Sequence, residues 1–551
     1  MKSQHRVAGA VRSLGGRALG GRRALRRQVP VAVAVLLAAM FTPLAAGSAA
    51  AATPTAQAEG LVCAAGSTAD FRNPTKVATN GAIPTHPGFV LTAQDGYITT
   101  PDGNSIYMWG YAAGGGSYQD PGPVLCVNEG DTVTITLANT LPVATSIQFP
   151  GLTGVMANGT PSQPDAATNS VATPAAAEPG SVPNASDPGK ATKVTYTFVA
   201  DHPGTFLYES GTDPQLQVQM GLVGAIVVRP KLGNPCLSPT SLDGKVPAGT
   251  VCTPSAHVYD DAGATPGMAT DPTSCAVPAG GLACFSTFNP TKEYLHVLSE
   301  IDPMVHSAME SPGSPGVYSY DMTTYKARYF FINGRSFPDT VSPNFAAHIP
   351  SQPYGALAHI QPRNTQRYLT GTTPNPDYNP DSALIRYLNT GPVDYPFHPH
   401  SNNERQIGFD AHPMINNTAA ATPTDVSIDR YSVVVPPGST IETEFAWVDQ
   451  ANWNPATHPV DSGDPGTVPV PEQQARTEGQ YWSGSPYLGW QNDLSTGKTQ
   501  FNECGEMYQV AHSHALFQAT NYGASMGGML TMIRIDPPNS FAEHAHCTTG
   551  N

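Results

Sequence analysis

Positive charge is scarce in this sequence. Its 551 residues include 27 Lys and Arg against 42 Asp and Glu, so the formal net charge at pH 7 is −15. An N-terminal segment of 58 residues, argued below to be a signal, holds eight of the basic residues; without it the balance is 19 against 42, a net charge of −23. Such a surface repels phosphate backbones and anionic lipid, which excludes nucleic acid as a partner. General solubility explains the acidity most simply, and attraction of cationic substrates or metal ions is the alternative.

Long helical periodicity is also missing. The chain has 53 Gly and 54 Pro, and short alternating runs recur between these turn signals. In 131–139, Val133, Ile135 and Leu137 alternate with threonines, and 193–199 repeats the pattern. Because side chains of a strand point alternately to its two faces, a period of two indicates half-buried strands. The sequence therefore predicts an all-β protein of sandwich or barrel type.

Apolar sequence long enough to span a membrane is absent after the N-terminus. At the N-terminus, a basic stretch containing Arg22 and Arg23 precedes an apolar run over 31–41 and an Ala-rich region with small-residue cleavage sites. That order predicts a signal peptide over 1–58, hence a secreted or cell-envelope protein with no membrane span. The paired arginines suggest the twin-arginine export route.

Eight cysteines follow the predicted signal, and an even number in an exported chain favours disulfides. They are Cys63, Cys126, Cys236, Cys252, Cys275, Cys284, Cys504 and Cys547. Cys236 with Cys252, and Cys275 with Cys284, are candidate local pairs, but the sequence does not choose among the connectivities.

The chain divides into several regions after the signal. Alternating segments predict a first β-domain over 59–230 and a second over 291–538, each made of short strands. Residues 231–290 hold four cysteines and few apolar runs, which is typical of a disulfide-containing linker. Residues 539–551 form a polar C-terminal tail.

Two His-x-His pairs are the strongest chemical signal. They lie far apart in segments that read as strands, and both belong to the second β-domain: His398-Pro399-His400 and His512-Ser513-His514. Residues i and i+2 of a strand share a face, so neighbouring strands would bring all four imidazoles together. Imidazole suits copper, zinc, iron and nickel, which predicts a transition-metal site. Chance is the alternative, because the chain has 16 His and a third pair, His544-Ala545-His546, lies in the tail.

Several short phrases follow one another in a fixed order after residue 88. They include Gly130-Asp131-Thr132-Val133, Gly204-Thr205-Phe206-Leu207-Tyr208, Ile332-Asn333-Gly334-Arg335 and Pro396-Phe397-His398-Pro399-His400. This order resembles that of the multicopper oxidases, a family of repeated cupredoxin domains. The resemblance implies tandem cupredoxin-like Greek-key β-sandwiches, two domains rather than three, and copper as the cofactor, with another transition metal as the alternative.

The same resemblance shows which copper ligands this chain lacks. At the family's first-domain histidine positions the chain reads Gln148-Phe149-Pro150 and Glu209-Ser210-Gly211. The type 1 copper positions are occupied by Tyr395, Ser513, Gln518 and Gly523. A blue copper site requires a thiolate, which serine does not supply. The resemblance thus implies a histidine-only site at His398, His400, His512 and His514, and it does not support laccase-type four-electron reduction of dioxygen.

The resemblance leaves several functions open. It implies an exported copper-binding protein, with oxidoreductase activity towards a small molecule or a metal ion as one outcome. A non-catalytic cupredoxin scaffold or a copper-handling protein of the cell envelope is the alternative. Gln148, Glu209 and Asp213 either supply oxygen ligands that favour a harder metal such as manganese or only form hydrogen bonds. Assembly as a homotrimer is also implied.

Overall fold

The computed structural model describes fourteen ranges of the chain. They are 59–66, 86–166, 170–179, 193–229, 292–314, 316–361, 369–371, 373–377, 379, 382–400, 403–416, 424–446, 507–523 and 527–535. All belong to one unit that runs from Thr55 to Asn551. The predicted signal peptide, the linker and the tail lie outside these ranges, as do six of the eight cysteines and the third histidine pair. None of the helices within the described ranges is long and apolar enough to cross a membrane.

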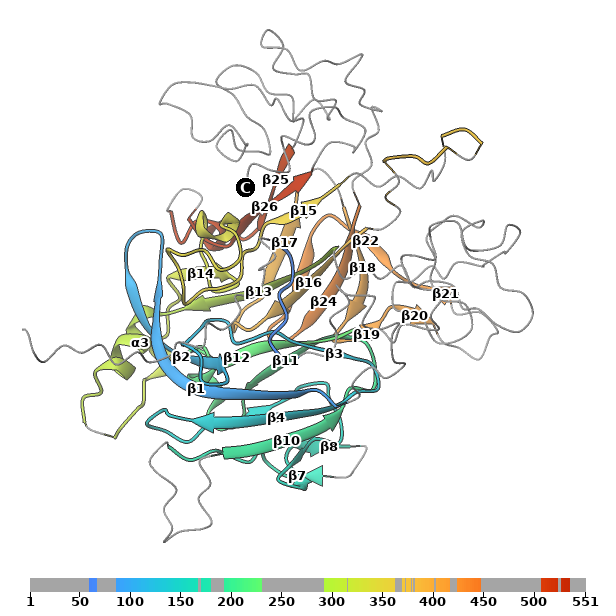
Figure 1. Cartoon of the computed structure of the whole chain (residues 1–551). Coiled ribbons are helices and arrows are strands. Elements are labelled where there is room, and N and C mark those ends of the chain that lie inside the picture. Colours follow the sequence, from blue (N-terminus) through green and yellow to red (C-terminus); the bar gives the residue numbers. More distant parts are fainter. Residues whose placement is uncertain are drawn as a thin grey trace, which may run out of the picture. The chain divides into compact units, whose positions relative to one another are not determined.

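The first β-sandwich packs a six-stranded sheet against a four-stranded one (Figure 1). The larger sheet has the order β2-β1-β4-β10-β6-β7 and the smaller one β3-β12-β11-β5. Their strands are β1 (Gly88–Thr99), β2 (Ser105–Ala113), β3 (Leu125–Asn128), β4 (Thr132–Asn139), β5 (Ile147–Gln148), β6 (Met156–Ala157), β7 (Thr160–Pro161), β10 (Lys193–Val199), β11 (Gly204–Ser210) and β12 (Val223–Arg229). The short pair β8 (Pro164–Asp165) and β9 (Ser170–Val171) lies off these sheets.

The second β-sandwich repeats this plan with a seven-stranded and a five-stranded sheet. The first has the order β14-β13-β16-β24-β18-β19, with β22 also pairing β18, and the second β15-β26-β25-β17-β23. Their strands are β13 (Glu293–Ile301), β14 (Tyr329–Ile332), β15 (Ala358–Ile360), β16 (Ala383–Asn389), β17 (Tyr395–Pro399), β18 (Glu404–Phe409), β19 (His412–Pro413), β22 (Ile428–Arg430), β23 (Val433–Val435), β24 (Thr440–Phe445), β25 (Met507–Ser513) and β26 (Leu530–Ile535). A separate pair joins β20 (Ile415–Asn416) to β21 (Thr424–Asp425).

Helices are few and short. Those described are α2 (Pro214–Gln217), α3 (Pro303–Glu310), α4 (Leu516–Ala519) and the 3₁₀ turns η4 (Met322–Thr324) and η5 (Asp339–Val341). The sandwich fold predicted from the alternating pattern is therefore confirmed. In β4 the alternating sequence pattern matches the burial pattern, because every second side chain of the strand is buried.

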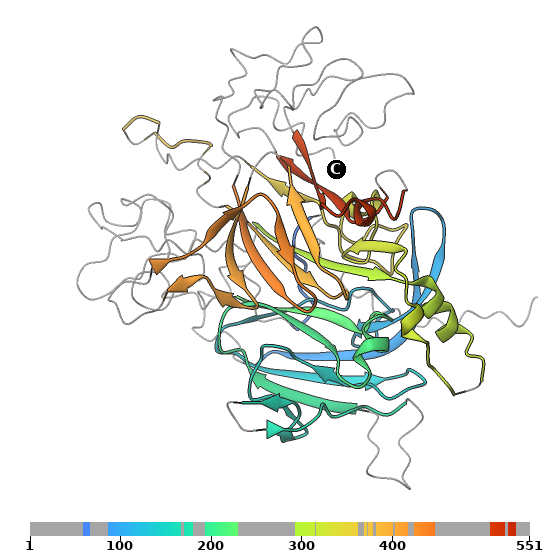
Figure 2. The same cartoon turned by 180° about the vertical axis from the view of Figure 1, so that it is seen from behind.

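The two sandwiches are internal repeats of each other (Figures 1 and 2). In each, the first strand runs parallel to the third strand of its sheet, β1 to β4 and β13 to β16. Asn139 at the end of β4 donates its amide to the carbonyls of Val143 and Ala177. Asn389 at the end of β16 does the same to Val393 and Val435. Neighbouring strands such as β3 and β12 are distant in sequence, as the predicted Greek-key connections require.

The smaller sheet of the first sandwich turns one face towards the second sandwich. Phe206 and Tyr208 of β11 point into the first core, whereas Leu207 packs with Leu295, Val297 and Leu388 of the second sandwich. Because β12 and β16 are covered on both faces, all of their residues are buried, and both read as nearly continuous apolar runs.

An N-terminal strap over residues 59–66 joins both sandwiches. The backbone N–H of Leu61 donates to the carbonyl of Glu293 at 2.8 Å, and that of Ala64 donates to the carbonyl of Val124 at 2.7 Å. A disulfide between Cys63 and Cys126 ties the strap down. This pair was not among the local pairs that sequence spacing suggested, because its partners are brought together by the fold.

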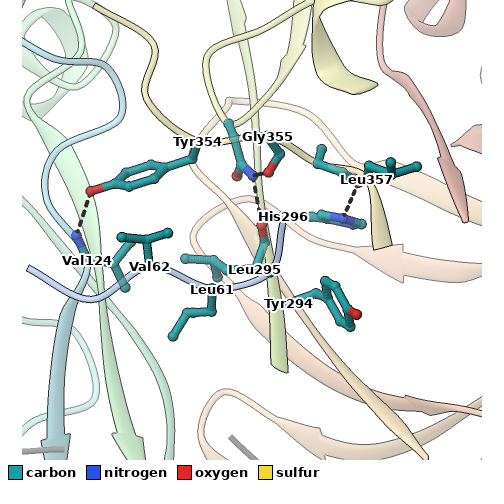
Figure 3. Close-up of a pocket in the computed structure, with 12 residues that line it drawn as sticks. Leu61, Val62, Val124, Tyr294, Leu295, His296, Tyr354, Gly355 and Leu357 are labelled. Carbon is teal, nitrogen blue, oxygen red and sulfur yellow. Dashed lines mark hydrogen bonds between the residues drawn. The ribbon is translucent and has the colours of Figure 1, made fainter. Parts of the chain in front are cut away.

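Buried side chains fill the space beneath the strap (Figure 3). The hydroxyl of Tyr354 accepts a hydrogen bond from the backbone N–H of Val124. Nε2 of His296 lies 3.1 Å from the carbonyl oxygen of Ala356. Burial lowers the pKa of His296 to about 4. The pocket measures about 10 Å³, which is the lower limit for one water molecule, so this seam is packing rather than a ligand site.

Candidate metal centre

Neighbouring strands carry the two His-x-His pairs. β17 and β25 are antiparallel, and His398 lies directly opposite His512. His400 and His514 follow the ends of these strands: the backbone N–H of His400 donates to the carbonyl of Val510 at 2.8 Å, and that of His514 donates to the carbonyl of Pro396 at 2.7 Å. These bonds extend the ladder by one residue on each side, so each pair keeps the i, i+2 relation of a strand.

The four imidazoles gather in one cluster, called here the histidine quartet: His398, His400, His512 and His514. Ring centroids are 5.1 Å apart for His398 and His400 and for His400 and His512, and 5.3 Å apart for His398 and His514. His398 lies 5.9 Å from His512, and His512 lies 5.8 Å from His514. His512 is buried, His398 and His400 are half-buried and His514 is exposed, so the quartet opens to the surface on one side.

Backbone carbonyls orient two of the rings. Nδ1 of His398 contacts the carbonyl of Tyr431, and Nδ1 of His512 lies 2.7 Å from the carbonyl of Ser513. A carbonyl oxygen only accepts hydrogen bonds, so each Nδ1 carries the hydrogen, and in the neutral ring each Nε2 keeps its lone pair. Metal-ligating histidines are commonly oriented in this way.

The Nε2 atoms of His400 and His512 are joined by a hydrogen bond, and their spacing is close to that of two ligands of one ion. Their Nε2 atoms are 3.1 Å apart. Two imidazole nitrogens that each lie about 2.0–2.1 Å from one ion, at an angle near the tetrahedral value, are separated by about 3.1–3.4 Å. Within the described ranges, however, no three His, Cys, Asp or Glu side chains surround a common metal position. Nε2 of His400 therefore donates to Nε2 of His512, and a metal would take the place of this hydrogen while His398 and His514 turned their rings to complete the set.

The charge state of the quartet also suits metal ligation. Burial, followed by the other three imidazoles, lowers the pKa of His400 to about 4. Burial is also the largest cause that lowers the pKa of His512. A neutral imidazole is the form that binds a metal, and both rings are neutral at pH 7.

Three residues at the positions that the resemblance assigns to type 1 copper ligands are joined to their surroundings by hydrogen bonds. Ser513 donates its hydroxyl to Oε1 of Gln518 in α4, and Nε2 of Gln518 donates to the carbonyl of Asp394 at 3.3 Å. The Tyr395 hydroxyl donates to Oε2 of Glu300 at 3.2 Å. Ser513, Gln518 and Tyr395 are all buried, so this part of the core is filled and satisfied without a metal.

The first sandwich has a hydrogen-bonded pair where the second has histidines. Glu209 on β11 lies opposite Gln148 on β5, as His512 lies opposite His398. Nε2 of Gln148 donates to Oε1 of Glu209 at 2.7 Å. Asp213 instead accepts from the backbone N–H of Leu216 as the N-cap of α2. The structure therefore brings Gln148 and Glu209 together and places Asp213 in a capping role.

One cluster escaped the sequence analysis. In the first sandwich, Thr145 and Ser210 both donate hydroxyl hydrogens to Oε1 of Gln217, at 2.8 and 2.6 Å. Ser210 precedes a helical turn that carries Gln217, just as Ser513 precedes the turn that carries Gln518. A serine–glutamine hydrogen bond thus occurs in both halves of the molecule, but the spacing between its partners differs, seven residues in one and five in the other, so the sequence gives no common motif for it.

Comparisons with known proteins find similar solved structures only. No family model matches the sequence, and no curated protein matches it. The structure is similar to a multicopper oxidase named mgLAC, with 16% identity, 82% of this chain and 86% of the other covered, and a TM-score of 0.41. It is also similar to two proteins from Nitrosomonas europaea. One is a blue copper oxidase, with 17% identity, 82% of this chain and 86% of the other covered, and a TM-score of 0.43. The other is a copper nitrite reductase, with 16% identity, 82% of this chain and 94% of the other covered, and a TM-score of 0.40. Multicopper oxidases and copper nitrite reductases are thus among the solved structures to which this tandem β-sandwich protein is similar.

Proposed function

We propose that this chain is a copper-binding protein whose site is formed by the histidine quartet alone. The observation that carries the proposal is the pair of facing strands that holds His400 and His512 with their Nε2 atoms 3.1 Å apart. His398 and His514 lie within 6 Å of this pair, measured between ring centroids, and would complete the ligand set. Imidazole also suits zinc, iron and nickel, and copper is preferred here because of the family resemblance.

Bound copper would supply a redox-active ion with open coordination positions at the surface. The chain's own part is to hold neutral imidazoles, to orient them through the carbonyls of Tyr431 and Ser513, and to leave one side open to a small-molecule or metal-ion substrate. The position of the type 1 thiolate ligand holds Ser513 instead of a cysteine. The hydroxyl of Ser513 is hydrogen-bonded to Gln518. Laccase-type reduction of dioxygen is therefore not part of the proposal.

A second candidate is a non-catalytic scaffold or a copper-handling protein of the cell envelope. It is favoured by the filled type 1 position and by the Gln148–Glu209 bond that replaces histidines in the first sandwich. The export that this role requires rests on the signal peptide predicted for residues 1–58. Dioxygen uptake in the presence of phenols, Fe(II) or Mn(II) separates the two candidates, because only an oxidase consumes oxygen with turnover.

Metal analysis tests the site itself. We expect the purified protein loaded with Cu(II) to retain about one ion per chain, and the His400→Ala/His512→Ala variant to bind copper at least tenfold more weakly, since two oriented ligands are removed. His348→Ala is the matched control, because that imidazole is exposed and lies outside the quartet. Titration calorimetry and the copper electron paramagnetic resonance spectrum provide the measurements.

Two outcomes would contradict the copper site. One is wild-type protein that retains no stoichiometric copper after loading. The other is a double variant that keeps the copper content and spectrum of the wild type, which would place the ion elsewhere in the chain.

A homotrimer is the assembly that we propose from the resemblance. The quartet opens beside the exposed side chains of Tyr431, Val434 and Leu516, a surface that a second copy of the chain could cover. Light scattering after size exclusion should give three times the chain mass. A monomeric mass at all concentrations would refute the trimer and leave the copper site untouched.

A further inference from the structure

A second pocket lies between the two sandwiches, away from the histidine quartet. It has a volume of about 380 Å³ and is open to solvent. One wall comes from the end of β11 and from α2 with the turn after it, and the other from the loop after β16, residues 389–392. The size is within the range of small-molecule sites, which is about 300–1,000 Å³. None of the quartet histidines lines it.

Glu209 turns its carboxylate towards this pocket. On β11, Thr205, Leu207 and Glu209 share the face that meets the second sandwich, because they alternate with the core residues Phe206 and Tyr208. Oε1 accepts from Gln148. The other carboxylate oxygen has no hydrogen-bond partner within the described part of the chain, and Glu209 is one of the lining residues.

The pocket contains negative charge without a counter-charge of its own. None of the twelve described lining residues is Lys, Arg or His. Behind the wall, the hydroxyl of the lining residue Tyr325 donates to Oε1 of Glu300 at 3.1 Å, so a second carboxylate contributes to the local potential. Burial is the main cause that raises the pKa of Glu209, as expected for a carboxylate that lacks a cation nearby.

The remaining walls are largely apolar. Val218, Met322, Pro214 and Pro392 face the pocket, together with the ring of Tyr325. Apolar walls with one charged group at the end favour an amphiphilic ligand, whose cation meets the carboxylate and whose body packs on the walls.

We propose that this pocket binds a small organic cation, a primary ammonium group on an apolar body, with the Glu209 carboxylate as its anchor and Met322 and Val218 as the walls for the body. The ammonium donates to the free oxygen of Glu209, while Gln148 holds the other oxygen in place. The site is independent of copper, because its residues and those of the histidine quartet do not overlap.

The test uses the full chain and phenethylamine as the probe, with 2-phenylethanol as its neutral counterpart of the same shape. By titration calorimetry in about 150 mM salt, where exposed charges are largely screened, we expect the amine to bind at least tenfold more tightly than the alcohol. Glu209→Gln keeps an acceptor for Gln148 but removes the charge, and should abolish this preference. Met322→Trp should fill the pocket and weaken both probes.

Two controls separate this site from other binding. Asp201→Asn removes an exposed carboxylate that lies just before the start of β11, whereas Glu209 lies near the end of that strand. This variant should leave amine binding unchanged. His400→Ala/His512→Ala should also leave it unchanged, even where copper binding is lost. The proposal fails if the wild type does not prefer the amine, if Glu209→Gln keeps that preference, if Met322→Trp binds both probes as the wild type does, or if only the histidine variant loses the amine.

Discussion

Replacing Glu293 by Ala is expected to lower the free energy of unfolding by about 3–5 kcal/mol, the usual cost of removing one partner from a buried ion pair. Glu293 begins β13, and its carboxylate lies between two arginines. Its Oε2 accepts from Nε and Nη2 of Arg229 at 3.0 and 2.7 Å, and its Oε1 accepts from Nε of Arg386 at 2.8 Å. The side chains of Glu293 and Arg386 are fully buried, and that of Arg229 is 4% exposed. In the variant, the buried guanidinium groups of Arg229 and Arg386 would lose the carboxylate that offsets the cost of removing them from water.

This network also joins the two sandwiches. Arg229 ends β12 of the first, whereas Arg386 lies in β16 of the second and donates to the hydroxyl of Thr205 on β11 at 3.0 Å. The backbone N–H of Thr205 donates in turn to Oε1 of Glu442 at 2.6 Å. Burial alone would raise the pKa of Glu293, but attraction to Arg229 and Arg386 outweighs it and holds the pKa below its ordinary value. The carboxylate therefore stays charged at neutral pH.

Urea denaturation followed by circular dichroism measures the effect of Glu293→Ala. Glu310→Ala is the matched control, because Glu310 is exposed and forms only a surface hydrogen bond with Tyr97, and its loss should change stability by less than about 1 kcal/mol. A Glu293→Ala protein within 1 kcal/mol of the control would show that the arginines find other partners, contrary to the expectation.

The contribution of two buried carboxyl groups to stability is expected to fall as the pH rises from about 4.5 to 7. Burial raises the pKa of Glu404 on β18 to about 7 and that of Asp120 also to about 7. In this window these two groups keep protons in the folded state that they release in the unfolded state, so their own contribution shrinks with each unit of pH and levels off above about pH 7, whereas His296 and His400, whose pKa values are lowered, contribute in the opposite direction. Glu404 alone accounts for about 3 kcal/mol, since each unit of pKa shift is worth about 1.4 kcal/mol.

Glu404→Gln isolates this contribution. Oε1 of Glu404 accepts from the hydroxyl of Tyr387 at 2.6 Å, and a glutamine carbonyl can accept the same bond. The variant should match the wild type near pH 4.5 and become the more stable protein at pH 8, by as much as about 3 kcal/mol. Denaturation curves at pH 5, 6, 7 and 8 give the comparison, with Glu310→Gln as control. Parallel pH profiles for wild type and Glu404→Gln would refute the assignment.

The strands were predictable where the pattern is local. Alternation placed β4 and β10 within a residue, because a half-buried strand shows its two faces directly in the sequence. Less regular strands are harder to bound: β14 ends at Ile332, because Asn333 turns with a positive φ of 55°. β24 begins at Thr440, in a stretch where threonine and glutamate make the alternation hard to see.

The candidate site was only partly predictable. The spacing of the histidine pairs placed two imidazoles on one strand face, and the structure adds that β17 and β25 are neighbours. The carbonyls that orient His398 and His512 could not be foreseen, since Tyr431 is 33 residues from His398. The serine–glutamine bonds of both sandwiches were missed for a related reason: the family comparison drew attention to absent ligands rather than to what replaces them.

The residues alone determine the all-β class, the excess of acidic charge and the two His-x-His pairs, because composition, alternation and i, i+2 spacing are local properties of the chain. Tertiary packing alone decides that His400 and His512 meet at 3.1 Å, that Glu293 is enclosed by two arginines, and that Glu209 faces a pocket between the sandwiches. Each of these features joins side chains from distant strands. Which strands become neighbours depends on the burial of both sheets at once, and no single segment carries that information.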